Sequence, residues 1–301
     1  MISLRWIASP LASALYACDA LRRRLSFVDP RLAEALREPA GRLVRAIGTS
    51  DLPVERLWAN LLPTAATHEH DTARHLIDVA VLKVVARHQI HANLDHFADR
   101  LMAFERAFLA AVPNAVEELE LRARPLREQW DARGPGLLTA VGEFTEPGLI
   151  VPQGSVGMVH PVLGGGGSAY PDFNAIIWEA VLTNPVPQLP EAVRLGWLLS
   201  QLNLELPRYQ GDLQRERSIE LGSWAMLPAV LAAAEQLELV RFDEATMRLA
   251  VKSWRIHVPR SSAFVHDLMS WWQTFQADRP PWTVAITALD MLIATEEGEM
   301  V

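Results

Sequence analysis

Histidine is concentrated in one short part of this 301-residue chain. Six of the nine histidines lie between residues 68 and 96, and they are His68, His70, His75, His88, His91 and His96. Imidazole nitrogens and carboxylate oxygens are the ligands that proteins use for zinc and iron. One hypothesis from this pattern is a metal-dependent hydrolase that holds a divalent metal at the cluster.

The spacing of acidic residues around these histidines selects the candidate ligands. Asp71 and His75 are four residues apart, and so are His91 and Asp95. Residues four apart lie on the same face of a helix, so each pair offers one imidazole and one carboxylate to an ion. We therefore take Asp71, His75, His91 and Asp95 as the candidate metal ligands.

Helix length limits that hypothesis. The sequence predicts a helix over about 71–87, whose rise of about 1.5 Å per residue separates His70 from His88 by roughly 27 Å. The cluster then forms two half-sites, and each needs ligands from another element. The alternative interpretation is that these polar side chains cap helices and face solvent, with no cofactor bound.

A run of four glycines is the second feature that could do chemistry. Gly164, Gly165, Gly166 and Gly167 follow a predicted strand and precede an apolar segment. Backbone N–H groups of a glycine-rich loop can surround a phosphate, which makes a small-molecule or nucleotide binder a second hypothesis. The run lacks the Lys-Ser/Thr pair of a P-loop and the GxGxxG spacing, so a flexible hairpin or lid is the favoured interpretation.

The chain offers no nucleophile in a recognised setting. It contains no GxSxG sequence, and its single cysteine, Cys18, has no histidine beside it. Trp271 and Trp272 form an aromatic pair that is a candidate surface for a ligand or partner, although tryptophans at helical spacing lie more often in a core. These observations favour a protein without catalytic activity.

The chain outside its middle has the apolar periodicity of helices. Predicted helices include 31–47, 93–111, 117–130, 137–144, 190–204, 219–237, 244–254, 262–275 and 282–293. Short strands are predicted at 149–151, 156–160 and 174–182, where β-branched residues lie between glycines and prolines. The expected fold class is mainly α (α+β), with a small β-sheet or hairpin at about 149–182.

Two further boundaries follow from local sequence. Intervals of three and four residues predict one helix at the N-terminus, with Leu4, Ile7, Leu11, Leu15 and Cys18 on one face. Gly134-Pro135-Gly136 predicts a break between the helix that ends near Trp130 and the one that begins at Leu137.

Composition sets the remaining limits. The chain carries 28 Lys and Arg against 36 Asp and Glu, a net charge of −8 that provides no basic footprint for nucleic acid. Its longest uncharged stretch, 147–171, is rich in glycine and proline, so no membrane-spanning helix is predicted. A single cysteine is typical of a reducing compartment, and we expect a soluble, cytoplasmic protein. We predict a helical domain at 1–124 and an α+β domain at 125–301, or one continuous domain.

The order of elements over about 125–204 resembles the core of zincin-type metallopeptidases. A helix ending near Trp130, short strands, the glycine-rich turn, a strand at 174–182 and a buried helix follow one another. In that family the last helix carries the HExxH sequence that binds zinc. The matching helix over 190–199 contains no histidine, so the resemblance implies a zincin-like scaffold without the metal ligands.

The function expected from the sequence is a non-catalytic protein-interaction or scaffolding role. The chain is 50% hydrophobic and has ten tryptophans, yet it shows no complete catalytic set. The expected partner is another protein or a second copy of the chain. The metal-dependent hydrolase and the binder at the glycine run stay open as alternatives.

Overall fold

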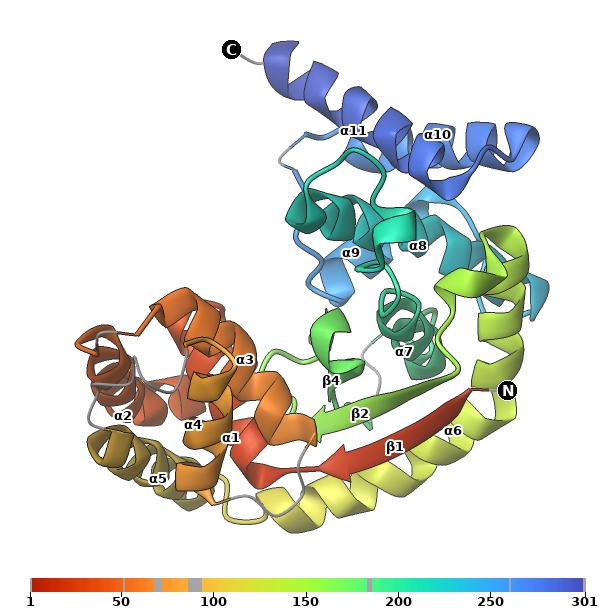
Figure 1. The fold of residues 1–301 in the computed structure, drawn as a ribbon. Helices are drawn as coiled ribbons and strands as arrows, with labels where there is room; N and C mark the ends of the chain where they lie inside the picture. The colour runs from red at the N-terminus through yellow and green to blue at the C-terminus, as the bar shows by residue number, and fades with distance from the viewer. Residues whose placement is uncertain are drawn as a thin grey trace.

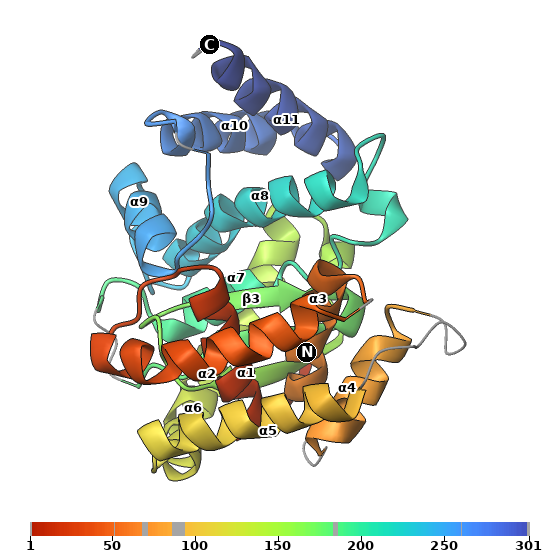
Figure 2. The same ribbon diagram turned by 90° about the vertical axis from the view of Figure 1, so that its left-hand side faces the viewer.

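A small four-stranded sheet lies at the centre of the computed structural model, with helices packed on both of its faces (Figures 1 and 2). The structure describes residues 2–50, 52–67, 72–85, 94–182, 186–259 and 261–299, the last five as backbone only. Across these ranges the protein is 66% helical, with 11 helices and the one sheet. The predicted class, mainly α with a small β element, is therefore confirmed.

The sheet brings the N-terminus to the middle of the sequence. Its strands are β1 (Ser3–Ala8), β2 (Gln153–Val159), β3 (Gly167–Tyr170) and β4 (Ala175–Glu179), in the spatial order β1-β2-β4-β3. β1, β2 and β4 run parallel, and β3 pairs antiparallel with β4. β1 and β3 are thus the two edge strands of the described sheet.

Strand β1 shows that the prediction of one helix from Leu4 onward is wrong. Leu4 and Ile7 lie in the strand, and helix α1 (Pro10–Arg22) begins after Ser9, whose side chain accepts the N–H of Ala12. Over so short a segment the apolar spacing fits either structure, and pairing with the distant β2 decides between them.

The central strands also differ from the prediction in detail. Two of the predicted strands are present as β2 and β4, whereas 149–151 follows a 3₁₀ turn (Pro147–Leu149) and forms no strand. The short edge strand β3 begins at Gly167, the last residue of the glycine run, and no strand was predicted there. Glycine at its first position weakened the strand signal.

Five helices from the first part of the chain form a group on one side of the sheet. They are α1, α2 (Pro30–Gly48), α3 (Val54–Thr67), α4 (Ala73–Leu82) and α5 (Leu94–Ala111). In this group α1 and α3 contact the strands, and the other three helices pack on them. Their buried apolar side chains form one core with Val159 and Ile177 of the sheet. Gly157 permits the close approach of α3, since a Cβ there would lie 2.5 Å from the Cβ of Ala66.

A single long helix, α6 (Ala115–Phe144), runs beside β1 (Figure 1). It passes through Pro125 and Pro135 without ending, so the predicted break at Gly134-Pro135-Gly136 is wrong. Each proline removes one backbone hydrogen bond. Burial of Leu137 against Gly196 of α7, with α6 packed along α7 and α8, stabilises the continuous helix despite this loss.

The remaining helices are α7 (Glu191–Leu199), α8 (Arg215–Gln236), α9 (Glu244–Ser253), α10 (Phe264–Asp278) and α11 (Trp282–Glu299). Of these, α7 packs on the opposite side of the sheet, and α8 to α11 form further layers beyond it (Figures 1 and 2). Every residue of α7 is buried, as expected for a central helix. Trp271 and Trp272 are 6% and 3% exposed, so they pack inside this core and do not form a surface patch.

Along the chain, the first hydrophobic core gives way to the second near the start of α6. The sheet is common to both cores, and the N-terminal strand β1 belongs to it. The predicted boundary near residue 124 stays a prediction. None of the helices within the described ranges has the length and apolar character needed to cross a bilayer.

Candidate functional site

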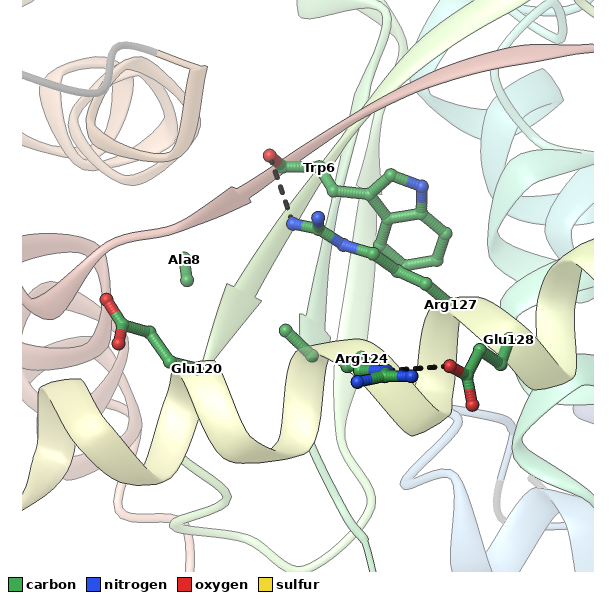
Figure 3. Close-up of a pocket in the computed structure, with 7 residues that line it drawn as sticks. Trp6, Ala8, Glu120, Arg124, Arg127 and Glu128 are labelled. Carbon is green, nitrogen blue, oxygen red and sulfur yellow. Dashed lines mark hydrogen bonds and ion pairs between the residues drawn. The ribbon is translucent and has the colours of Figure 1, made fainter.

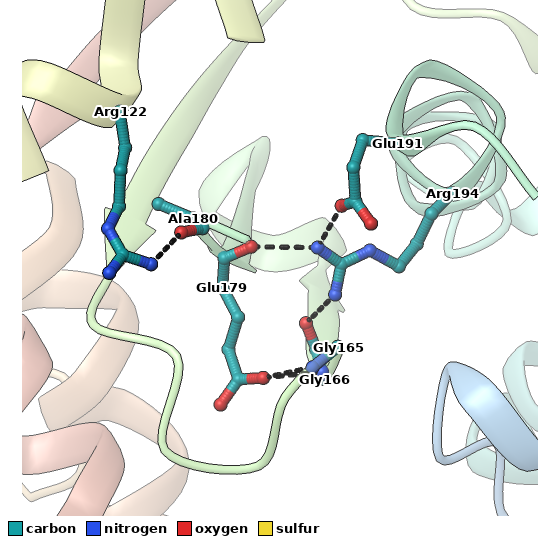
Figure 4. Close-up of polar contacts among 7 residues, drawn as sticks. All are labelled: Arg122, Gly165, Gly166, Glu179, Ala180, Glu191 and Arg194. Carbon is teal, nitrogen blue, oxygen red and sulfur yellow. Dashed lines mark hydrogen bonds and ion pairs between the residues drawn. The ribbon is translucent and has the colours of Figure 1, made fainter. Parts of the chain in front are cut away.

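The glycine loop is closed around a carboxylate that the protein itself supplies (Figure 4). Glu179, at the end of β4, is fully buried, and its Oε2 accepts the N–H groups of Gly165 at 2.6 Å and Gly166 at 2.7 Å. Its Oε1 accepts the N–H of Leu163 at 2.6 Å. Gly165 has φ +141°, a conformation that favours glycine and lets neighbouring N–H groups converge. These N–H groups are thus occupied by an internal anion.

Arg194 of α7 ties the same loop to the body of the protein (Figure 4). Its Nη1 donates to the carbonyl of Gly166 at 2.6 Å, and its Nη2 donates to the carbonyl of Glu179 at 2.7 Å. Nη2 also donates to the carboxylate of Glu191. Since the Arg194 side chain is 1% exposed, these acceptors offset the cost of burying its charge. The loop is therefore hydrogen-bonded to Glu179 of β4 and to Arg194 of α7, so it is not a free lid.

Glu191 and Arg122 extend this network. Burial raises the pKa of Glu191, and the adjacent Arg194 opposes that rise. Arg122 of α6 donates to the carbonyl of Ala180 at 3.0 Å, so the end of β4 is held from a third element (Figure 4). These charged side chains link the sheet, the loop and two helices, although the buried Nε of Arg194 has no hydrogen-bond partner.

The histidine cluster is only partly within the described residues. Asp71 and His91 lie outside them, together with His68, His70 and His88. His75 is exposed on α4, and Asp95 at the start of α5 accepts a bond from Arg74, which also pairs with Asp78 at 3.0 Å. Among the described residues, no group of three or more His, Cys, Asp or Glu could hold a metal ion. The metal site stays a prediction.

A groove runs between β1 and α6 (Figure 3). It has a volume of about 490 Å³ beside Ala8 and continues in a second hollow of about 330 Å³ beside Leu4. Trp6 lines both hollows, and α6 forms the opposite wall with residues that include Arg124 and Arg127. The groove therefore follows the whole free edge of β1.

The backbone of β1 presents its outward polar groups to this groove. Ser3 donates its N–H to the carbonyl of Pro152 on the β2 side at 3.0 Å. In a parallel pair alternate residues bond to the partner strand, so Ser3, Arg5 and Ile7 face β2. The N–H and C=O groups of Leu4, Trp6 and Ala8 consequently point away from the sheet and into the groove.

Arg127 is the charged side chain placed nearest to that edge. Its Nη2 lies 3.5 Å from the carbonyl of Trp6, and its guanidinium lies 5.6 Å from the centre of the Trp6 ring. Its Nε is buried without a hydrogen-bond partner. Among the described residues Arg127 forms no ion pair, whereas Arg124 pairs with Glu128 at 2.8 Å (Figure 3).

Comparison of the chain with protein-family models, with curated proteins and with solved structures finds no match. The geometry of these sites is therefore the basis for assigning a function.

Sequence reasoning missed the residues that organise both sites. Glu191 and Arg194 are charges within an otherwise apolar helix, and such charges signal a buried polar network. Glu179 is the charged last residue of an apolar strand, which likewise indicates a buried polar network. No local pattern marked Trp6 or Arg127, because the groove exists only after β1 joins a strand far along the chain.

Proposed function

We propose that this protein has a non-catalytic, scaffolding role in which it binds an extended segment of another protein along the free edge of β1. The observation that carries the proposal is the outward orientation of the Leu4, Trp6 and Ala8 backbone groups, which line the groove beside α6. An added strand would satisfy those groups with main-chain hydrogen bonds, a common mode of peptide recognition.

The groove also suggests which segments would bind. Leu4 and Trp6 supply apolar surface, so alternate apolar side chains of the segment would pack there. Arg127 supplies a positive charge that forms no ion pair with a described carboxylate, although Glu120 and Glu128 line the same hollow. An acidic side chain of the segment opposite Arg127 would form an ion pair with the guanidinium. That pair would replace the long hydrogen bond from Arg127 to the Trp6 carbonyl.

Panning a peptide-display library against the intact protein tests this proposal. We expect enrichment of extended sequences that alternate apolar residues and contain at least one Asp or Glu. A synthetic copy of an enriched peptide should lose binding to Ala8→Pro, because proline removes an outward N–H and blocks the edge. It should bind Arg127→Gln about tenfold more weakly, since a charge-assisted hydrogen bond is lost.

Arg133→Gln is the matched control for Arg127→Gln. Arg133 is exposed on the same helix and lines neither hollow. Equal binding to the wild-type protein and to Ala8→Pro would overturn the proposal. Concentration-dependent dimerisation that Ala8→Pro abolishes would identify a second copy of the chain as the occupant and would also overturn a distinct protein partner.

A further inference from the structure

A second cleft lies at the other edge of the sheet, beside β3. Its volume is about 420 Å³. Segments that are far apart in sequence form its walls: α1 and the residues after it, the glycine loop with β3, and the end of α9 with the residues that follow. Because β1 and β3 are opposite edges of the sheet, this cleft is separate from the groove beside α6.

The floor of the cleft is built by the fastened glycine loop. Gly166 packs so closely against Tyr16 that a Cβ would overlap the tyrosine hydroxyl. A Cβ on Gly165 would lie 2.9 Å from the backbone carbonyl of Ser253, so the loop also meets the end of α9. Since Glu179 occupies the N–H groups of Leu163, Gly165 and Gly166, these three groups are not available to a ligand in the cleft.

The walls of the cleft carry an excess of positive charge. Arg23, Lys252 and Arg255 line the cleft, and Asp19 is the one carboxylate in the lining. Asp19 lies 3.7 Å from Arg23 and 3.0 Å from Arg22, so its charge is already matched. Lys252 and Arg255 form no ion pair among the described residues, and Arg255 donates only to the carbonyl of Leu163. Two exposed cations without an ion-pair partner among the described residues therefore line one cleft, in a chain whose net charge is −8.

Neutral donors and apolar surface complete the cleft. Tyr16 and Tyr170 line it, and their neutral hydroxyls are hydrogen-bond donors; burial raises the pKa of both. Leu25 and Ile256 add apolar surface beside the charges. The cleft therefore combines charged and polar groups with apolar surface, and both kinds of contact serve to hold and orient a small molecule.

We infer that this cleft binds a small phosphate monoester through Lys252 and Arg255, with its organic part against the tyrosine rings. A phosphate monoester carries close to two negative charges at neutral pH, because its second pKa is about 6. That charge matches the two cations, and phosphate oxygens accept bonds from ammonium, guanidinium and hydroxyl groups alike. The inference does not depend on the proposed peptide groove.

Calorimetric titration of the full-length protein with phenyl phosphate and with AMP tests the inference. We expect saturable binding of at least one probe that weakens as salt is added. Lys252→Gln and Arg255→Gln should each reduce the affinity about tenfold, as expected for loss of a charge-assisted contact. Arg248→Gln should leave it unchanged, because Arg248 is on the same helix but pairs with Glu244 outside the cleft.

Three outcomes would overturn the inference. One is no binding of either probe at about 10 mM, a concentration at which a millimolar site would also raise the melting temperature. Another is binding that both cleft variants leave intact. The third is equal binding of succinate or benzoate, which would show that the cleft accepts carboxylates without preference for phosphate. A midpoint within a few degrees of wild type for each variant shows that lost binding is not lost folding.

Discussion

The carboxylate of Glu179 and the backbone N–H of Gly166 are joined by a 2.7 Å hydrogen bond, so a buried anion links the last strand of the sheet to the glycine loop. Arg194 donates to the carbonyl of the same glycine from the other side. Gly166 is therefore bonded to a negative group through its N–H and to a positive group through its C=O. Through these two bonds the loop connects β4 with α7, and we expect it to contribute to the stability of the folded protein.

Glu179→Gln tests that support. Glutamine keeps the size of the side chain but removes its charge and turns an NH₂ group toward N–H donors that then lack an acceptor. We expect the free energy of unfolding to fall by about 2–4 kcal/mol in urea denaturation. Glu238→Gln, at an exposed turn, should change it by less than about 0.5 kcal/mol. A loss below about 1 kcal/mol for Glu179→Gln would show that the loop does not depend on the carboxylate.

His160 predicts a specific dependence of stability on pH. Burial lowers its pKa below the ordinary value of 6.5, with Arg122 acting in the same direction and Glu118 opposing. The unfolded chain therefore takes up the proton first as pH falls. The stability from the neutral histidine is present above about pH 6.5 and is lost as pH falls through the folded-state pKa.

The measurement is the free energy of unfolding of wild type and His160→Gln between about pH 7.5 and pH 5. We expect the wild type to lose stability more steeply on acidification than the variant. His266→Gln, whose side chain is 71% exposed, is the comparison for replacement of a surface histidine. Parallel curves for wild type and His160→Gln would contradict the assignment.

Gly157→Ala tests the packing of α3 on the sheet. An added Cβ would lie 2.5 Å from the Cβ of Ala66, and neither backbone can move freely. We expect a loss of about 1–3 kcal/mol in unfolding free energy, as for other overpacked cores. Gly48→Ala is the control, because nothing lies within 4 Å of a Cβ at that position. Equal effects of the two substitutions would mean that α3 does not pack tightly there.

The sequence predicts the local structure well where one element dictates it. Asp29 caps α2 by accepting the N–H of Arg31, and α7 is buried on all sides, as its composition indicates. Failures occur where distant segments decide. β1 needs β2 as a partner, and α6 continues through Pro135 because its apolar face packs against other helices.

The candidate sites follow the same rule. The glycine run was visible, but its internal anion was not, because Glu179 is brought to the loop by the pairing of β3 with β4. The cleft that contains Lys252 and Arg255 likewise requires α1 and α9 to meet at one edge of the sheet. The resemblance of 125–204 to zincins stays a prediction, as does the metal site.

Proline substitutions in β1 test which backbone groups face the groove. The N–H of Arg5 points to β2, so Arg5→Pro should break the ladder and cost about 3 kcal/mol or more of unfolding free energy. The N–H of Ala8 points outward, so Ala8→Pro should cost less than about 1 kcal/mol. Arg5→Ala measures the separate loss of the bond from Arg5 to the Thr67 carbonyl, which is subtracted from the Arg5→Pro effect. Equal losses after this correction would mean that the outward assignment, and with it the peptide groove, is wrong.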